Sequence, residues 1–338
     1  MRILLSGEVF PDSFAENVGC GFQELGHDVT HTADFFKQMG YGRMGRFAEM
    51  LATLLPQVEQ KAQLTLVRAA ADLQPDLVLC LNQPHPNVIR KLRQEVPRAR
   101  IAHWMSDALT GFFRQYNLAS DYDVMFFKDQ YIVDFVREKL GKKCFFPPQA
   151  ANPKWHRRMP LSAADRDLYG CDMTVAGNLY WYRALLMEPF LDYDIKIWGD
   201  YSPDWMNSPV RKFYPRRYVA CEEKAKAYGA AKIVFNAMHY AELLGCNLRL
   251  FEAAACGGFV IVDHRPNIHE VFEPGKEIVT FQGRDELKEK VDYYLAHEDE
   301  RRSIADACHE RAQRDHLYPT RLSQMLRYIF DDESTASS

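Results

Sequence analysis

Long apolar runs are missing from this sequence of 338 residues. Its longest runs, such as residues 77–81 and 259–262, have the length of a β-strand, whereas a membrane-spanning helix needs about 20 apolar residues. The chain also lacks the basic segment followed by an apolar stretch near Met1 that is typical of a secretory signal. We therefore expect a cytoplasmic protein without a membrane span.

Paired cysteines and an excess charge of one sign are missing as well. The eight cysteines are scattered and form no Cys-x-x-Cys pair, so neither a zinc site nor a disulfide framework is expected. The 42 lysines and arginines nearly balance the 46 aspartates and glutamates, and this balance gives no general attraction to nucleic acid. A Gly-x-Gly-x-x-Gly motif is absent after the first predicted strand, where Gly7 stands alone, which disfavours a Rossmann dehydrogenase.

What the sequence does contain is ample apolar material, at 47% of its residues, and a length that suits two domains of about 150 residues. Short apolar strands alternate with helical patterns in both halves, which is typical of parallel sheets covered by helices on both faces. We predict two Rossmann-like, doubly wound α/β domains over residues 1–160 and 161–316, with a polar hinge at 152–166. A helix within 317–332 and a flexible tail over 333–338 are predicted to follow.

The predicted elements rest on apolar periodicity and on the glycine, proline and asparagine stops between them. In the first half, strands are predicted at 1–6, 27–30, 77–81, 100–104, 123–127 and 143–146, and helices at 15–25, 47–73, 87–95 and 129–140. In the second half, strands are predicted at 172–176, 194–200, 231–236, 259–263 and 278–281, and helices at 182–190, 247–255, 285–297, 300–314 and 320–330.

The most informative stretch is 245–263, in which a glycine loop opens a short helix that leads to an apolar strand. Asn247 is predicted to cap a helix that runs to Ala255, and the free N–H groups at the start of that helix attract anions such as phosphate. Arg249 and Glu252 lie three residues apart, on nearly the same helical face. Arg249 would then face a phosphate, while Glu252 accepts hydrogen bonds from a ribose diol. The alternative is a surface ion pair without a ligand.

Several segments resemble the CgeB-type (spore maturation, YkvP-like) glycosyltransferases. They are residues 177–183 (GNLYWYR), 197–199 (IWG), 247–252 (NLRLFE) and 256–258 (CGG). This family belongs to the GT-B superfamily, in which two Rossmann-like domains face each other across a cleft and a nucleotide sugar lies on the second domain. The resemblance is most specific over residues 172–294, and it implies a glycosyltransferase whose C-terminal helix packs back on the first domain.

The resemblance also implies which residues hold the donor nucleotide and its diphosphate. Together with the charged and polar groups near them in the sequence, the candidates are Glu252, Arg249, Asn247, Leu248, Gly177, Asn178, Gly199, Lys224 and His239. One position departs from the pattern. Many retaining relatives carry a second glutamate eight residues before the ribose-binding one, where this chain has Leu244, and Glu242 is two residues away. Retention or inversion of the sugar's configuration therefore stays open.

Sugar transfer needs a stabilised leaving group and, in an inverting enzyme, a base that takes the acceptor's proton. Asp107 is the first candidate for this base, because it follows the carboxyl end of a predicted strand in the domain opposite the donor; the alternative is a helix cap. Asp12 and Glu16 are the further candidates, with solvated acids of a first helical turn as the alternative.

No metal ion and no cofactor are expected apart from the nucleotide sugar as co-substrate. Asp-x-Asp triplets begin at Asp121, Asp165 and Asp192, but their predicted places in a strand entry, a linker and a helix end argue against a divalent-ion motif. The acceptor is expected to be a glycan, a protein or a small molecule. Two other functions stay open, which are a nucleotide-sugar 2-epimerase of similar build and a non-catalytic surface or spore assembly protein that keeps the nucleotide site.

Overall fold

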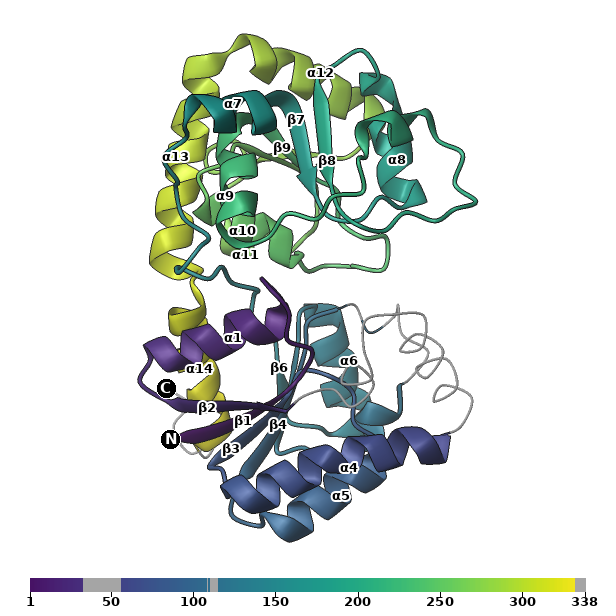
Figure 1. The fold of residues 1–338 in the computed structure, drawn as a ribbon, viewed down its shortest axis with the longest axis vertical. Coiled ribbons are helices and arrows are strands. Elements are labelled where there is room, and N and C mark those ends of the chain that lie inside the picture. Colours follow the sequence, from purple (N-terminus) through teal and green to yellow (C-terminus); the bar gives the residue numbers. More distant parts are fainter. Residues whose placement is uncertain (33–55, 108, 110–114, 332–338) are drawn as a thin grey trace. The chain divides into compact units, whose positions relative to one another are not determined.

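The chain folds into two compact units in a computed structural model that describes residues 1–32, 56–107, 109 and 115–331. The first unit consists of Met1–Pro147 together with the chain from Pro319 onward, and the second is Pro148–Tyr318. Figure 1 draws both units and labels most of their helices and strands. The chain enters the second unit ahead of the polar segment 152–166 that the sequence suggested as a hinge, and helix α7 (Ala163–Tyr169) begins within that segment.

The first unit is built on a parallel sheet of six strands in the order β2-β1-β3-β4-β5-β6. Its strands are β1 (Arg2–Ser6), β2 (Asp28–Thr32), β3 (Leu77–Cys80), β4 (Arg100–Met105), β5 (Val124–Phe127) and β6 (Cys144–Phe145). Strands β3 and β5 are apolar along their whole length, because helices cover both faces of the sheet (Figure 1). All six predicted strands of this half are confirmed.

Five helices and one 3₁₀ turn are described in the first unit. They are α1 (Phe14–Glu24), α4 (Pro56–Leu73), α5 (Pro86–Glu95), η2 (Gln115–Ala119), α6 (Gln130–Leu140) and α14 (Tyr318–Phe330), whose first residue belongs to the second unit. The start of the helix predicted at 47–73 and the tail predicted at 333–338 lie outside the described residues. In the described part of the chain, no helix is both long enough and apolar enough to cross a membrane.

Helix α14 returns to the first unit, as the family resemblance implied. The ring of Tyr328 stacks on Phe145 of β6, with ring centroids 4.1 Å apart and planes 18° apart. Phe126 of β5 lies on the same side, at a centroid distance of 6.5 Å from Tyr328. The last described helix therefore packs against the sheet that the beginning of the chain forms.

The second unit contains a parallel sheet of five strands in the order β11-β10-β9-β7-β8. Its strands are β7 (Cys171–Ala176), β8 (Ile195–Trp198), β9 (Ala231–Asn236), β10 (Val260–Asp263) and β11 (Val279–Phe281). Besides α7, its helical elements are α8 (Trp181–Met187), η3 (Glu188–Phe190), η4 (Pro209–Phe213), α9 (Cys221–Ala230), α10 (Leu248–Ala255), α11 (Ile268–Val271), α12 (Arg284–Ala296) and α13 (Glu298–Asp315). The predicted strands and the helices at 247–255, 285–297 and 300–314 are confirmed.

Helices α7, α9 and α11 are absent from the sequence prediction. Helix α9 matters most, since it precedes the central strand β9 and carries a buried lysine, Lys224. Its sequence, CEEKAKAYGA, has no clear apolar stripe. Small alanines and the fully buried Tyr228 hold it in the core instead, so packing and not periodicity places this helix.

Candidate functional site

Two glycines shape the carboxyl edge of the second sheet. Gly177 directly follows β7 with a φ of +146°, and a Cβ atom there would lie 2.4 Å from Nη2 of Arg249. Gly199 directly follows β8, and a Cβ atom there would lie 2.7 Å from the carbonyl oxygen of Gly177. Any larger residue would separate these backbones. The two loops can therefore touch each other, and a guanidinium can lie directly on the first of them.

Arg249, on the first turn of α10, reaches across the ends of β7 and β9. Its Nε donates a hydrogen bond to the carbonyl oxygen of Ala176, and its Nη1 donates to Oδ1 of Asn236 at 3.1 Å. Asn236 is the last residue of β9 and is fully buried. Neutral acceptors therefore hold the guanidinium beside the Gly177 loop.

Arg183, on α8, lies on the other side of the same loop. Its side chain is 1% exposed, its Nη1 donates to the carbonyl oxygen of Asn178, and its guanidinium lies 4.5 Å above the ring of Tyr180. Burial, and next the positive charge of Arg249, lower the pKa of Arg183 to about 10. In the described part of the chain its Nε has no hydrogen-bond partner, and no carboxylate forms an ion pair with Arg183 or Arg249.

These two guanidiniums bond to the carbonyl groups on either side of Gly177, from Ala176 and Asn178. A buried cation without an opposite charge is costly, because it loses its hydration and gains no ion pair. An anionic ligand with several acceptor oxygens would supply the missing charge and the missing hydrogen bonds.

The start of α10 adds to this anion-attracting edge. Oδ1 of Asn247 accepts a hydrogen bond from the backbone N–H of Leu250 at 3.2 Å, so the predicted helix cap is confirmed. The amide groups of Asn247 and Asn236 also exchange two hydrogen bonds of 3.0 Å each. This pair ties the helix to the end of β9, with the N–H groups of its first turn, beginning at Leu248, at the same edge of the sheet as Arg249.

Glu252 lies one turn further along α10 and is buried. Its Oε2 lies 3.0 Å from Nζ of Lys224 and its Oε1 lies 3.7 Å from Nε2 of His156. Nδ1 of His156 accepts the backbone N–H of Asn152 at 3.0 Å, and this bond directs Nε2 of the ring toward the carboxylate. The alternative of a surface pair between Arg249 and Glu252 is wrong, since Glu252 is buried with Lys224 on α9.

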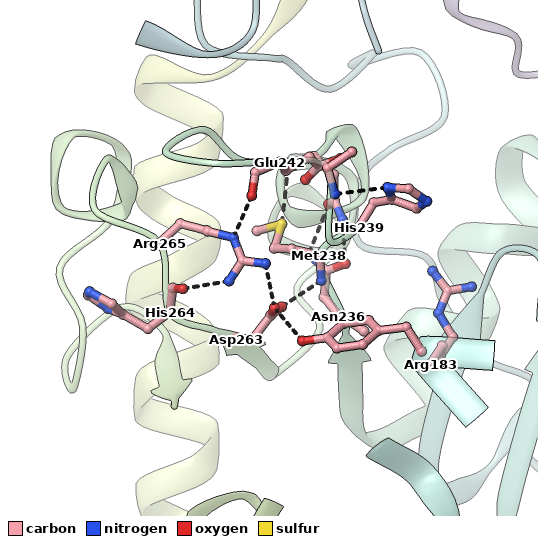
Figure 2. Close-up of polar contacts among 12 residues, drawn as sticks. Arg183, Asn236, Met238, His239, Glu242, Asp263, His264 and Arg265 are labelled. Atoms are coloured by element: carbon pink, nitrogen blue, oxygen red, sulfur yellow. Dashed lines mark hydrogen bonds and ion pairs between the residues drawn. The ribbon is translucent and has the colours of Figure 1, made fainter. Parts of the chain in front are cut away.

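A second polar cluster, drawn in Figure 2, holds the loop between β9 and α10 in place. Asp263, at the end of β10, accepts the backbone N–H of Met238 at 2.5 Å and forms an ion pair with Nη2 of Arg265 at 3.0 Å. Nε of Arg265 donates to the carbonyl oxygen of Glu242 at 2.9 Å. Burial raises the pKa of Asp263, and the charge of Arg265 opposes that rise. The cluster therefore fixes the loop after β9 at two points, the backbone of Met238 and the backbone of Glu242.

The remaining predicted residues of this loop are placed as follows. His239 accepts the backbone N–H of Ala241 on its Nδ1 at 3.2 Å, and its ring lies 5.4 Å from that of Tyr180. The carbonyl oxygen of Leu244 accepts the N–H of Asn267 at 3.0 Å. His239 is thus next to the Arg183 side of the site, whereas the backbone of Leu244 joins this loop to the one after β10.

In the first unit, Asp107 is exposed two residues after β4. Asp12 is buried with a φ of +64°, and its backbone N–H donates to Oε2 of Glu16 at 2.6 Å. Oδ1 of Asp12 accepts the side-chain amide of Asn17 at 3.0 Å. Both acids therefore belong to one hydrogen-bonded turn at the start of α1, and a catalytic role for any of the three acids stays a prediction.

Sequence reasoning missed several residues of the second unit's site, namely Arg183, His156, Asn236, Asp263 and Arg265. Three of them had a signal. Arg183 ends the segment 177–183 that carried the family resemblance, and Asn236 and Asp263 are polar residues that end apolar strands at the ligand-binding edge. His156 had none, because only the tertiary fold brings it to Glu252. Arg265 is two residues from Asp263 in the sequence, but nothing in that stretch predicts its hydrogen bond to the carbonyl oxygen of Glu242.

Two parallel α/β units with a C-terminal helix that returns to the first one define a protein of the GT-B class. A comparison with protein families matches residues 157–327 to the family described as glycosyl transferase-like. This match spans half of the chain, and the chain belongs to that family.

Individual relatives agree with this assignment. The chain is 26% identical over 188 residues to spore protein CgeB of Bacillus subtilis (strain 168), which covers 50% of this chain and 56% of that protein. This match confirms the CgeB-type resemblance, and the matched part spans little more than half of the relative. Among solved structures, sucrose-phosphate synthase from Thermosynechococcus elongatus has a TM-score of 0.67 at 13% identity, covering 97% of this chain and 99% of that one. Anabaena HepE in complex with UDP-glucose has a TM-score of 0.63 at 15% identity, covering 97% and 98%.

Proposed function

We propose that the second unit binds a nucleoside-diphosphate sugar and that the protein transfers the sugar to an acceptor. The observation that carries this proposal is the pair of guanidiniums, Arg183 and Arg249, on either side of Gly177 without an ion-paired carboxylate in the described part of the chain. A diphosphate has the charge and the number of oxygen acceptors that this pair lacks. Membership in the glycosyl transferase-like family and the UDP-glucose bound to the related fold of HepE support the same ligand.

Each part of this edge has a role in that reaction. Arg183, Arg249 and the N–H groups at the start of α10 hold the diphosphate and stabilise the negative charge that develops on it as the sugar leaves. These groups supply positive charge without a metal ion, so we propose a metal-independent transfer with no further cofactor. Glu252 accepts hydrogen bonds from the ribose diol, and its ion pair with Lys224 holds the carboxylate in place.

The group that takes the acceptor's proton is assigned to the first unit. We propose Asp107 as the group that takes the acceptor's proton, because it is exposed just beyond the carboxyl end of β4. The acceptor is a glycan, a protein or a small molecule.

Binding of UDP to wild-type protein and to Arg183→Met tests the donor site. UDP is expected to raise the melting temperature of the wild type, because a ligand that binds only the folded state stabilises it. Arg183→Met removes charged hydrogen bonds worth about 1.5–3 kcal/mol each, so its affinity for UDP is expected to fall by about ten- to a hundredfold. Thermal shift and calorimetric titration measure both effects.

Arg302→Met is the matched control, since Arg302 lies on α13 with a side chain that is 72% exposed. Its response to UDP should equal that of the wild type. Failure of UDP, GDP, dTDP and CMP alike to stabilise the wild type would contradict the proposal, and so would an unchanged response of Arg183→Met. Incubation with UDP-glucose alone then separates the remaining functions: an altered sugar nucleotide indicates an epimerase, and no turnover with any acceptor indicates a non-catalytic protein.

A further inference from the structure

Two tryptophans are displayed together on the surface of the second unit. Trp181 is the first residue of α8 and is 39% exposed, and Trp205 lies after β8 and is 74% exposed. Their ring centroids are 5.9 Å apart, with planes tilted by 35°. An indole left mostly in water loses the stabilisation that its burial would give. Exposed aromatic surface of this kind marks a place where something binds.

Hydrogen bonds from Arg211 fix the turn that carries Trp205. Nη1 of Arg211 donates to the carbonyl oxygens of Pro203 and Asp204, both at 3.4 Å, and of Met206 at 2.8 Å. Met206 is 1% exposed and packs into the core of the second unit. The residues on both sides of Trp205 are therefore fixed while the indole itself stays outside the core, so its exposure is built into the turn.

This turn is joined to the proposed diphosphate site. The backbone N–H of Tyr201 donates to Oδ1 of Asn178 at 3.3 Å, and the carbonyl oxygen of Tyr201 accepts the N–H of Leu179 at 3.1 Å. The carbonyl oxygen of the same Asn178 accepts the hydrogen bond from Arg183. The loop after β8 therefore connects the tryptophans to the arginines. A ligand bound to the two tryptophans would lie next to the proposed donor.

We propose that Trp181 and Trp205 form a stacking platform for the sugar rings of a glycan acceptor. A pyranose ring presents C–H groups with slightly positive hydrogens, which pack well on the electron-rich face of an indole. The exposed neighbours of Trp205 in the sequence, Asp200, Asp204 and Asn207, offer hydrogen-bonding groups for sugar hydroxyls. Asp204 also forms an ion pair with Nη2 of Arg216 at 3.1 Å, so its charge is compensated and the platform suits a neutral glycan.

The exposure of the two tryptophans indicates whether the sugar that stacks on them belongs to the acceptor or to the donor. A donor sugar is a single ring attached to the diphosphate, which Arg183 and Arg249 hold in the proposed site. A chain of several sugars extends beyond the reacting unit and can use an indole that is 74% exposed. The assignment to the acceptor rests on the proposed function, whereas the binding of glycan by the tryptophans does not.

Binding of the full-length protein to arrayed neutral oligosaccharides tests this platform. The array carries short and long chains of glucose, mannose, galactose and N-acetylglucosamine. The wild type is expected to bind at least one series, with long chains bound better than short ones. Trp205→Ala is expected to weaken this binding by about tenfold or more, as is common for a tryptophan at the centre of a contact.

Tyr293→Ala is the control, because Tyr293 is an aromatic residue of α12 that is 44% exposed on the same unit. Its glycan binding should equal that of the wild type, and Trp205→Ala should keep the UDP-induced thermal shift. No glycan binding by the wild type, or equal binding by Trp205→Ala, would overturn the proposal. Self-association that Trp205→Ala abolishes would also overturn it and assign the pair to a contact between copies. Glycan binding without any thermal shift on addition of UDP would contradict the proposed donor site and leave the glycan platform standing.

Discussion

At the scale of single residues, the cations of the second unit's site differ in the charge of their partners. Lys224 forms an ion pair with Glu252, in which the two side chains are 8% and 6% exposed. Arg183 and Arg249 have only neutral partners in the described part of the chain. An internal pair serves to hold a carboxylate in one place, whereas an unpaired cation attracts an external anion. The contrast separates the residues that position the site from those that contact the ligand.

Lys224→Met tests the positioning role. Removal of the ammonium group leaves the carboxylate of Glu252 buried without its main counter-charge, and we expect a loss of about 3–5 kcal/mol in the free energy of unfolding. The double variant with Glu252→Gln should recover much of this loss, because a neutral amide needs no cation. Urea denaturation followed by circular dichroism measures both.

Lys288→Met provides the comparison at an exposed pair. The side chains of Lys288 and Asp292 are 37% and 46% exposed, and loss of such a pair costs less than about 1 kcal/mol. Equal stability of Lys224→Met and Lys288→Met would show that Lys224 does not support Glu252.

At the scale of elements, α10 joins the anion-binding edge to the core. Its cap, Asn247, is also the hydrogen-bond partner of the buried Asn236 at the end of β9. Arg249 donates to the same Asn236. A single asparagine thus sets the start of the helix and its distance from the central strand, and the arginine is aligned as a consequence.

Asn247→Ala should therefore cost more than an ordinary cap. Loss of the cap itself costs about 1 kcal/mol, and the buried amide left on Asn236 adds about 1–3 kcal/mol. Ser162→Ala at the exposed start of α7 removes a cap of the same chemistry without a buried partner and should cost about 1 kcal/mol. Chemical denaturation of both variants gives the comparison, and equal losses would argue against the Asn236 pairing.

At the scale of the whole molecule, the chain crosses between the units twice, and α14 belongs to the first of them. The stack of Tyr328 on Phe145 ties the end of the described chain to β6. The proposed donor site lies wholly in the second unit. Substitutions at the contact between α14 and β6 should therefore change the stability of the first unit. They should leave ligand binding by Arg183 and Arg249 unchanged.

Tyr328→Ala tests this division. The lost aromatic contact should destabilise the first unit by about 0.5–1.5 kcal/mol, while the affinity for UDP stays at the wild-type value. Tyr131→Ala on α6, where the side chain is 51% exposed, should change stability by less than about 0.5 kcal/mol. Calorimetric unfolding and UDP titration of each variant provide the measurement. A large loss of UDP affinity in Tyr328→Ala would contradict the assignment of the donor site to the second unit alone.

The sequence by itself determined the strands of both sheets, because most of them are apolar runs that stand out between glycine and proline stops. It also determined the capped start of α10, since Asn247 and the apolar pattern that follows are local signals. Only the tertiary structure decided that Glu252 pairs with Lys224 and His156 and that Arg183 joins Arg249 at Gly177. These partners come from separate elements, and α9 has too weak a pattern to be predicted. Local periodicity determines which segments form strands and helices, whereas the compensation of a buried charge depends on groups that only the packed fold brings together.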